Sequence, residues 1–81
     1  MANPLRMVAR PLQRRDREAA RAFILALLRN GPVPFAQVRA QAQAARLPFK
    51  HVKTVARELK VELVRFGFGR GSYWSWQLPA A

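Results

Sequence analysis

A set of cationic and hydrogen-bonding side chains recurs at helical spacing in the second half of the chain. The set consists of Lys50, Lys53, Thr54 and Arg57, with His51 beside them. On a helix with about 3.6 residues per turn, the first four share one face about 10 Å long. Lysine and arginine bind phosphate oxygens and also the O6 and N7 atoms of guanine. The spacing therefore indicates a surface that binds a polyanion.

The charge of the whole chain supports this interpretation. Its 81 residues include 15 Lys and Arg but only 4 Asp and Glu, for a formal net charge of +11. Residues 1–15 contribute +4 and residues 31–81 contribute +6, and five of the eight cations in the latter segment fall between Arg46 and Lys60. Such a field attracts nucleic acid, an anionic membrane or an acidic protein, and it does not distinguish among them.

The composition argues against several other classes of protein. With 51% hydrophobic residues, the chain is too apolar for a disordered basic tail. It has no cysteine, and one histidine and one aspartate are too few for a metal site or a Ser-His-Asp relay. We therefore expect a binding domain without a cofactor rather than an enzyme. The longest apolar run, residues 22–28, is too short for a bilayer of about 30 Å, so we expect a cytoplasmic, nucleoid-associated protein.

The length allows one small domain. Residues 1–15 contain Pro4 and Pro11 and lack a sustained apolar period, so we expect a flexible basic arm there and a folded domain over residues 16–81. The arm would add phosphate contacts through its four arginines, and we include the last two in the predicted binding site. The four are Arg6, Arg10, Arg14 and Arg15.

Three helices are predicted from apolar spacing. The first runs over residues 16–29, capped by Asp16, and ends at Asn30-Gly31-Pro32. After an extended Val33, the second runs over residues 34–46, with Pro34 in its first turn. The third runs over residues 48–60. The expected inward residues are Ala20, Phe23, Ile24, Leu27 and Leu28 in the first, Phe35, Val38, Ala42 and Ala45 in the second, and Val52, Val55, Ala56 and Leu59 in the third.

The period changes to that of strands near residue 61. Residues 61–66 and 73–78 read as two strands, and the glycines of the segment 67–72 permit a tight hairpin that carries Arg70. Because no helix follows this glycine-rich segment, we reject a nucleotide-binding loop. Trp74, Trp76 and Leu78 alternate along the second strand, and we expect them to enter the core, although stacking of the tryptophans on unpaired bases is an open alternative.

This order of elements predicts an α+β fold, a winged helix-turn-helix with three helices followed by a two-stranded β-hairpin wing. The helix over residues 48–60 would enter the major groove of DNA, and the hairpin carrying Arg70 would approach the DNA backbone or the minor groove.

The run from Leu47 to Val61, the Gly67-Phe68-Gly69-Arg70-Gly71 turn and the Trp74-Ser75-Trp76-Gln77-Leu78-Pro79 ending together resemble the winged-helix module at the C-terminal end of plasmid and phage replication ATPases and related mobile-element proteins. The resemblance covers roughly residues 20 to 79. It implies binding to double-stranded DNA, with the recognition role on Lys50, His51, Lys53, Thr54 and Arg57 and the wing role on Arg70.

The chain departs from that pattern in two respects. Pro48 and Phe49 stand where the family has a polar helix start, and the ATPase portion is absent from these 81 residues. The sequence thus predicts a monomeric or homodimeric DNA-binding protein, a transcriptional regulator or replication-associated factor of a bacterium, phage or mobile element. Two alternatives stay open: an assembly module that binds an acidic protein partner, and a binder of RNA or single strands.

Overall fold

The fold of residues 12–79 combines three helices with three strands, and the strands form one small sheet. A computed structural model describes residues 12–79. Its elements are, in chain order, α1 (Arg14–Leu28), β1 (Val33–Pro34), α2 (Phe35–Ala44), α3 (Phe49–Glu58), β2 (Glu62–Phe66), a 3-10 turn (Gly69–Gly71) and β3 (Tyr73–Gln77). Three helices and an antiparallel sheet of three strands confirm the predicted α+β class.

The strand order of the sheet is β1-β3-β2. β2 and β3 form the predicted hairpin, with Leu63 opposite Trp76 and Arg65 opposite Trp74. The segment around Val33 is extended as expected, but it also pairs with β3, with Val33 opposite Trp76. This third strand was not predicted, because two residues beside prolines give no alternating pattern. This pairing attaches the link between α1 and α2 to β3, the middle strand of the sheet.

α1 starts two residues earlier than predicted, so Arg14 and Arg15 belong to the helix and not to an arm. The assignment of Asp16 as the cap is wrong. Gln13 is the capping residue, and its backbone N–H donates to Oδ2 of Asp16 at 3.2 Å. A carboxylate at the third helical position reaches back to the cap in this way. The rest of the predicted arm, residues 1–11, lies outside the described residues.

α2 and α3 end by the same device, two residues before the predicted ends. Arg46 and Lys60, just beyond the helices, have φ of 59° and 60°. The N–H groups of Leu47 and Val61 donate back to Ala42 and Ala56, each at 2.9 Å. A left-handed residue followed by such a bond is a usual helix ending, most often built on glycine. The sequence offered no glycine at either position, so the ends were placed too late.

The core lies where the helices meet the sheet, and it follows the predicted stripes. The fully buried hydrophobic side chains are Ala20, Ile24 and Leu28 of α1, Val38 and Ala42 of α2, Val52, Val55 and Ala56 of α3, and Trp76 of β3. Phe23, Leu27, Phe35, Leu59 and Leu78 are half-buried and pack against them. Ala45, expected inside, is exposed because α2 ends before it.

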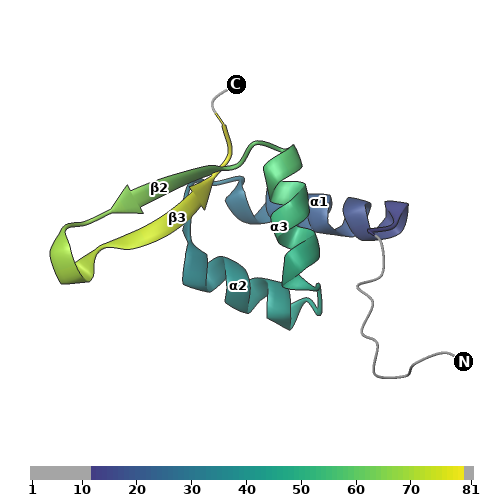
Figure 1. Ribbon diagram of the computed structural model, residues 1–81, viewed down its shortest axis with the longest axis horizontal. Helices are drawn as coiled ribbons and strands as arrows, with labels where there is room; N and C mark the ends of the chain where they lie inside the picture. Colours follow the sequence, from purple (N-terminus) through teal and green to yellow (C-terminus); the bar gives the residue numbers. More distant parts are fainter. Residues whose placement is uncertain (1–11, 80–81) are drawn as a thin grey trace, which may run out of the picture.

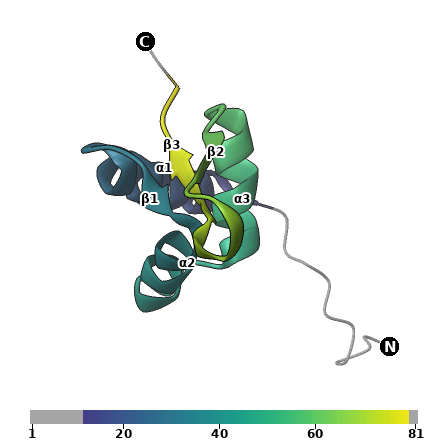
Figure 2. The same ribbon diagram turned by 90° about the vertical axis from the view of Figure 1, so that its left-hand side faces the viewer.

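The two tryptophans of β3 have different surroundings. Trp76 is 5% exposed, whereas Trp74 is 52% exposed, so the expectation that both enter the core is wrong for Trp74. Both point to the same side of the strand. The hairpin extends past the helices (Figure 1), and Phe35 and Phe49, at the starts of α2 and α3, pack on Trp76. Figure 2, seen from the hairpin side, shows the helices grouped behind it. Alternation predicts which side a residue faces but not how far the covering layer reaches.

Candidate nucleic-acid interface

α3 presents its predicted cationic face to solvent. Val52, Val55 and Ala56 hold the opposite face in the core. The exposed side chains of this face are Lys50, Lys53, Thr54 and Arg57, and Glu58 is exposed at its edge. Each lies three or four positions from a neighbour in this set, so they form a continuous surface along the helix. We call it the α3 face.

The hydroxyl of Thr54 is already oriented. Its Oγ1 donates to the backbone carbonyl of Lys50 at 2.9 Å. A hydroxyl has one proton and two acceptor lone pairs, so Thr54 offers the α3 face an acceptor rather than a donor. An amino group of a base, or a lysine moving on binding, would suit that acceptor.

His51 lies at the side of the α3 face, where it is half-buried. Glu58 follows it by two helical turns on the same side, and Oε2 of Glu58 is 3.1 Å from a guanidinium nitrogen of Arg17 in α1. α1 therefore flanks this side of α3. His51 belongs to the predicted recognition set, and the structure places it half-buried beside the α3 face and not on the exposed face itself.

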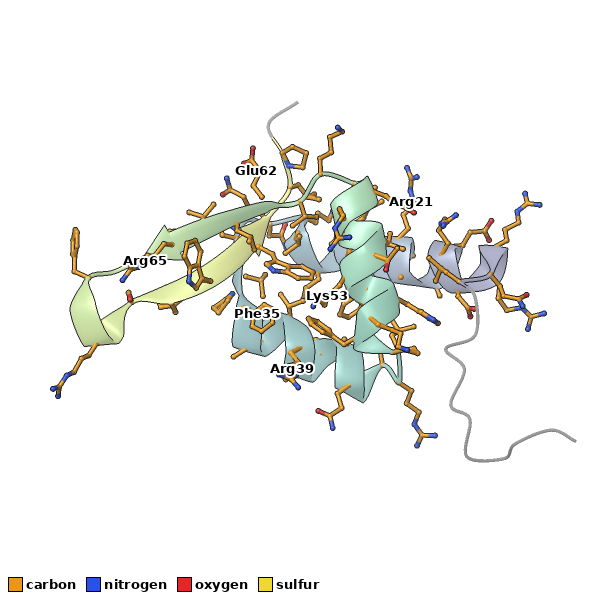
Figure 3. The ribbon with its side chains drawn as sticks, in the orientation of Figure 1. Arg21, Phe35, Arg39, Lys53, Glu62 and Arg65 are labelled. Carbon is orange, nitrogen blue, oxygen red and sulfur yellow. The ribbon has the colours of Figure 1, made fainter. Side chains whose placement is uncertain are left out.

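The other side of α3 faces the hairpin. Lys53 follows Phe49 by one turn and shares its side of the helix. Phe49 packs against Phe35 of α2 and Trp76 of β3, with ring centroids 5.6 and 5.9 Å away. In Figure 3, Lys53 accordingly lies toward α2 and the hairpin. This lysine thus connects the α3 face with the sheet.

The hairpin tip carries the predicted Arg70 and a neighbouring ring. Arg70 is exposed in the 3-10 turn, and Phe68 just before it is 97% exposed. Gly67 and Gly69 have φ of 83° and 60°, which side chains rarely adopt. The glycines therefore allow the chain to reverse tightly, and they leave Arg70 free to extend from the end of the hairpin.

Two cations outside the predicted set also border this surface. Arg65 of β2 is exposed, and its Nη2 donates to Oγ of Ser72 at 3.0 Å. Arg39 of α2 is exposed and lines a hollow of about 230 Å³ with Gln43, Leu47 and Phe49. Sequence reasoning passed over Arg65 because a lone arginine in a strand is usually a solvated surface residue. Its position opposite Trp74 depends on the register of the two strands, which the alternation alone does not determine.

The acidic residues offset little of the positive charge of these cations. All four of them lie within residues 12–79, and each has a partner there. Asp16 accepts from Gln13, Glu18 is 3.4 Å from Arg14, Glu58 is 3.1 Å from Arg17, and Glu62 accepts from Gln77 at 2.9 Å. Of the 13 Lys and Arg in this segment (15 in the chain less Arg6 and Arg10), only Arg14 and Arg17 are in ion pairs.

Arg14 and Arg15 are separate from the hairpin cations. They begin α1, at the end of the molecule farthest from the hairpin tip that holds Arg70, and α3 lies between (Figure 1). Arg14 is strongly exposed even though it pairs with Glu18. These arginines extend a basic surface on the far side of α3. They do not join Arg70 in one cluster.

Comparison of the chain with protein-family models, curated proteins and solved structures finds no match. The resemblance to the winged-helix module of replication ATPases therefore stays a prediction. None of the helices formed by residues 12–79 is long and apolar enough to cross a bilayer.

Proposed function

We propose that this chain is a winged helix-turn-helix protein that binds double-stranded DNA, with α3 as the recognition helix and the β2–β3 hairpin as the wing. The α3 face carries this proposal. It is a helix surface with three cations, bordered by one acid, Glu58, that is paired with Arg17. The buried Val52, Val55 and Ala56 anchor it from behind. Because these buried residues hold α3 against the rest of the domain, the helix can enter a DNA groove without moving relative to the core.

The geometry of α2 and α3 supports this assignment. Only residues 45–48 separate the two helices, a turn length typical of helix-turn-helix units. The major groove of B-DNA is about 12 Å wide and accepts one helix. Lys50 and Arg57 would then reach phosphates or guanine edges, and Thr54 would accept from an exocyclic amino group.

The hairpin supplies the second part of the interface. Arg70 at its exposed tip would contact the DNA backbone or the minor groove, where a narrow, glycine-rich turn approaches closely. Arg14 and Arg15 would add phosphate contacts on the other side of α3. By this proposal the protein is a transcriptional regulator or replication-associated factor of a bacterium, phage or mobile element.

The alternative partner is an acidic protein. We favour DNA because the cations extend from α1 across α3 to the hairpin tip, a length that a phosphate backbone can follow with regular charges. A protein-assembly role would bury apolar surface around the cations. The α3 face has no large hydrophobic side chain, and the exposed ones lie mainly on the hairpin. A homodimer is compatible with either role and would place two α3 faces on successive half-sites.

A salt-dependent binding titration tests the proposal. Fluorescence anisotropy with a labelled duplex should give an affinity that falls linearly with salt on log-log axes, with a slope of about −0.9 per phosphate contact, and we expect about five to seven contacts. Lys50→Gln should reduce the slope by about one. A flat response, or equal affinity for polyglutamate and DNA, would contradict duplex binding. Selection from a random DNA pool would identify the preferred sequence.

A further inference from the structure

The hairpin exposes apolar side chains beyond the helices. On β2, Leu63 is 64% exposed, and on β3, Trp74 is 52% exposed. Single exposed hydrophobic residues are ordinary on a protein surface, but a tryptophan contributes one of the largest apolar areas that a residue can expose. Leu63 and Trp74 are two of the five large hydrophobic residues that this short hairpin exposes, and a group of that size indicates a contact surface.

The sheet register places these residues on one side, together with a cation. Leu63 lies opposite Trp76 and Arg65 opposite Trp74. Directly opposite residues of an antiparallel pair point to the same side, with Cβ atoms about 4.5 to 5.5 Å apart. Leu63, Arg65 and Trp74 therefore form one patch, which we call the Trp74 face.

The other rings of the sheet already have partners. Phe66 and Tyr73 stack on each other across the opposite side of the hairpin, with centroids 5.8 Å apart and planes at 20°. Trp76 packs against Phe35 and Phe49. Trp74 belongs to neither group of rings within residues 12–79. Its indole, 52% exposed, is thus a ring of the sheet that has no aromatic partner among the described residues.

Arg65 is held in place beside this indole. Its Nη2 donates to Oγ of Ser72 at 3.0 Å, and that hydroxyl donates in turn to the carbonyl of Gly69 at 2.8 Å. A guanidinium has five N–H donors in a planar fork, so this bond leaves several for a ligand. The bond also reduces the side-chain freedom that a phosphate contact would otherwise have to remove.

We propose that the Trp74 face binds an unpaired nucleotide of single-stranded DNA, with the base stacked on the indole of Trp74 and the phosphate on the guanidinium of Arg65. Stacking on aromatic side chains is the common way to hold unpaired bases. A base inside a duplex has both faces covered by its neighbours, whereas an unpaired base has a face free to stack on this indole.

The charge of the hairpin selects nucleic acid over an apolar protein segment as the occupant. From Leu63 to Gln77 the hairpin has two cations, Arg65 and Arg70, and no acid. Its acid at the base, Glu62, accepts a hydrogen bond from Gln77. An aromatic ring beside an ordered guanidinium matches the alternation of base and phosphate along a strand, and a purely apolar partner would leave Arg65 without a counter-charge.

The inference rests on the proposed function in one respect, because α3 would hold the duplex that flanks the unpaired nucleotide. The protein should therefore prefer a duplex with a single-stranded extension to the same duplex with blunt ends. Such a preference suits a protein that acts where strands separate, and it would favour the replication-associated role.

The test compares three ligands by anisotropy: a short blunt duplex, that duplex with a single-stranded thymidine extension, and the extension strand alone. Trp74→Ala should lower affinity for the extended duplex by about 5- to 150-fold, the range for loss of one stacked base, and leave the blunt duplex unchanged. Trp74→Phe should retain most of the affinity. Phe68→Ala, which removes another exposed ring of the same hairpin, is the matched control and should have little effect.

Tryptophan fluorescence gives a second measurement on the unmodified protein. Because Trp76 is buried and Trp74 is exposed, binding of the single strand should quench the fluorescence of Trp74 and protect it from quenching by iodide.

Equal binding of blunt and extended duplexes with an unchanged tryptophan signal would overturn this inference while leaving duplex binding intact. Binding of the strand through Trp74 without any binding of blunt duplex would instead overturn the proposed function and support the Trp74 face. If Trp74→Ala changes only the oligomeric state in sedimentation, the face is a protein contact and the inference is wrong.

Discussion

The ring of Phe49, the first residue of α3, stacks on the indole of Trp76 in β3, with centroids 5.9 Å apart and planes at 24°. Phe35, the first residue of α2, contacts both, with its ring centroid 5.6 Å from Phe49 and 6.0 Å from Trp76. These three rings hold the starts of α2 and α3 on the sheet. The position of the α3 face relative to the hairpin therefore depends on them.

Truncation of Trp76 should cost a large part of the stability of the domain. We expect Trp76→Ala to lower the free energy of unfolding by about 3 to 5 kcal/mol, out of the roughly 5 to 15 kcal/mol of a typical small protein. The cause is a cavity between Phe35 and Phe49. Thermal denaturation followed by circular dichroism measures the loss.

Trp74→Ala is the matched control, since it removes the same side chain from the same strand at a half-exposed position. It should change stability by less than about 1 kcal/mol, as surface substitutions do. Equal losses for the two variants would mean that Trp74 is buried in solution, and neither the description of the hairpin nor the Trp74 face would then hold.

The hairpin turn should respond differently to alanine at two of its glycines. At Gly67, φ is 83° and an added Cβ would lie 3.1 Å from the carbonyl oxygen of Gly71, so Gly67→Ala should destabilise by about 1 to 2 kcal/mol. Gly71 has no positive φ, and an added Cβ there meets nothing within 4 Å. Gly71→Ala should be neutral or should stabilise by about 0.4 to 1 kcal/mol. Urea denaturation of both variants checks the difference, and a more destabilising Gly71→Ala would contradict the turn geometry.

The sequence was sufficient for the elements whose signal is local. Helical spacing predicted the buried Val52, Val55 and Ala56 and the exposed cations opposite them. The glycines placed the hairpin turn correctly. Asp16 was chosen as a cap because aspartate favours that position, but the same carboxylate serves equally well three residues inside the helix.

What the sequence could not show depends on distances between elements. The helix ends at Arg46 and Lys60 require these two residues to adopt a left-handed backbone conformation. No local pattern indicates that an arginine or a lysine takes the conformation that glycine usually provides. The exposure of Trp74 follows from how far α2 and α3 extend under the sheet. The position of Arg65 beside Trp74 and Ser72 depends on the register of β2 and β3. The geometry of the turn determines that register.

Within the proposed interface, the α3 face should set specificity. Arg57→Gln or Lys53→Gln should cost about 1 to 3 kcal/mol at one base pair if the side chain reads a base. Arg14→Gln, a strongly exposed arginine outside α3, should weaken binding to all sequences alike. The measurement is competition between the selected sequence and a random duplex. Equal effects on both duplexes from every α3 variant would mean that α3 supplies only charge.

The ion pair between α1 and α3 gives a prediction in the opposite direction. Glu58 is the acid of α3, and its carboxylate is 3.1 Å from Arg17 with both side chains about half exposed, at 44% and 48%. Exposed pairs of this kind contribute about 0 to 1 kcal/mol, so Glu58→Gln should barely change stability. It removes a negative charge beside the α3 face and releases Arg17, so affinity for duplex DNA should rise, most strongly at low salt.

Glu62→Gln is the matched control. It makes the same change in net charge at the base of the hairpin, where Glu62 accepts a hydrogen bond from Gln77. If α3 enters the groove, Glu58→Gln should strengthen binding more than Glu62→Gln does in the same anisotropy titration. An equal gain from both would show that DNA responds to the total charge of the protein, and a larger gain from Glu62→Gln would place the DNA along the hairpin instead of along α3.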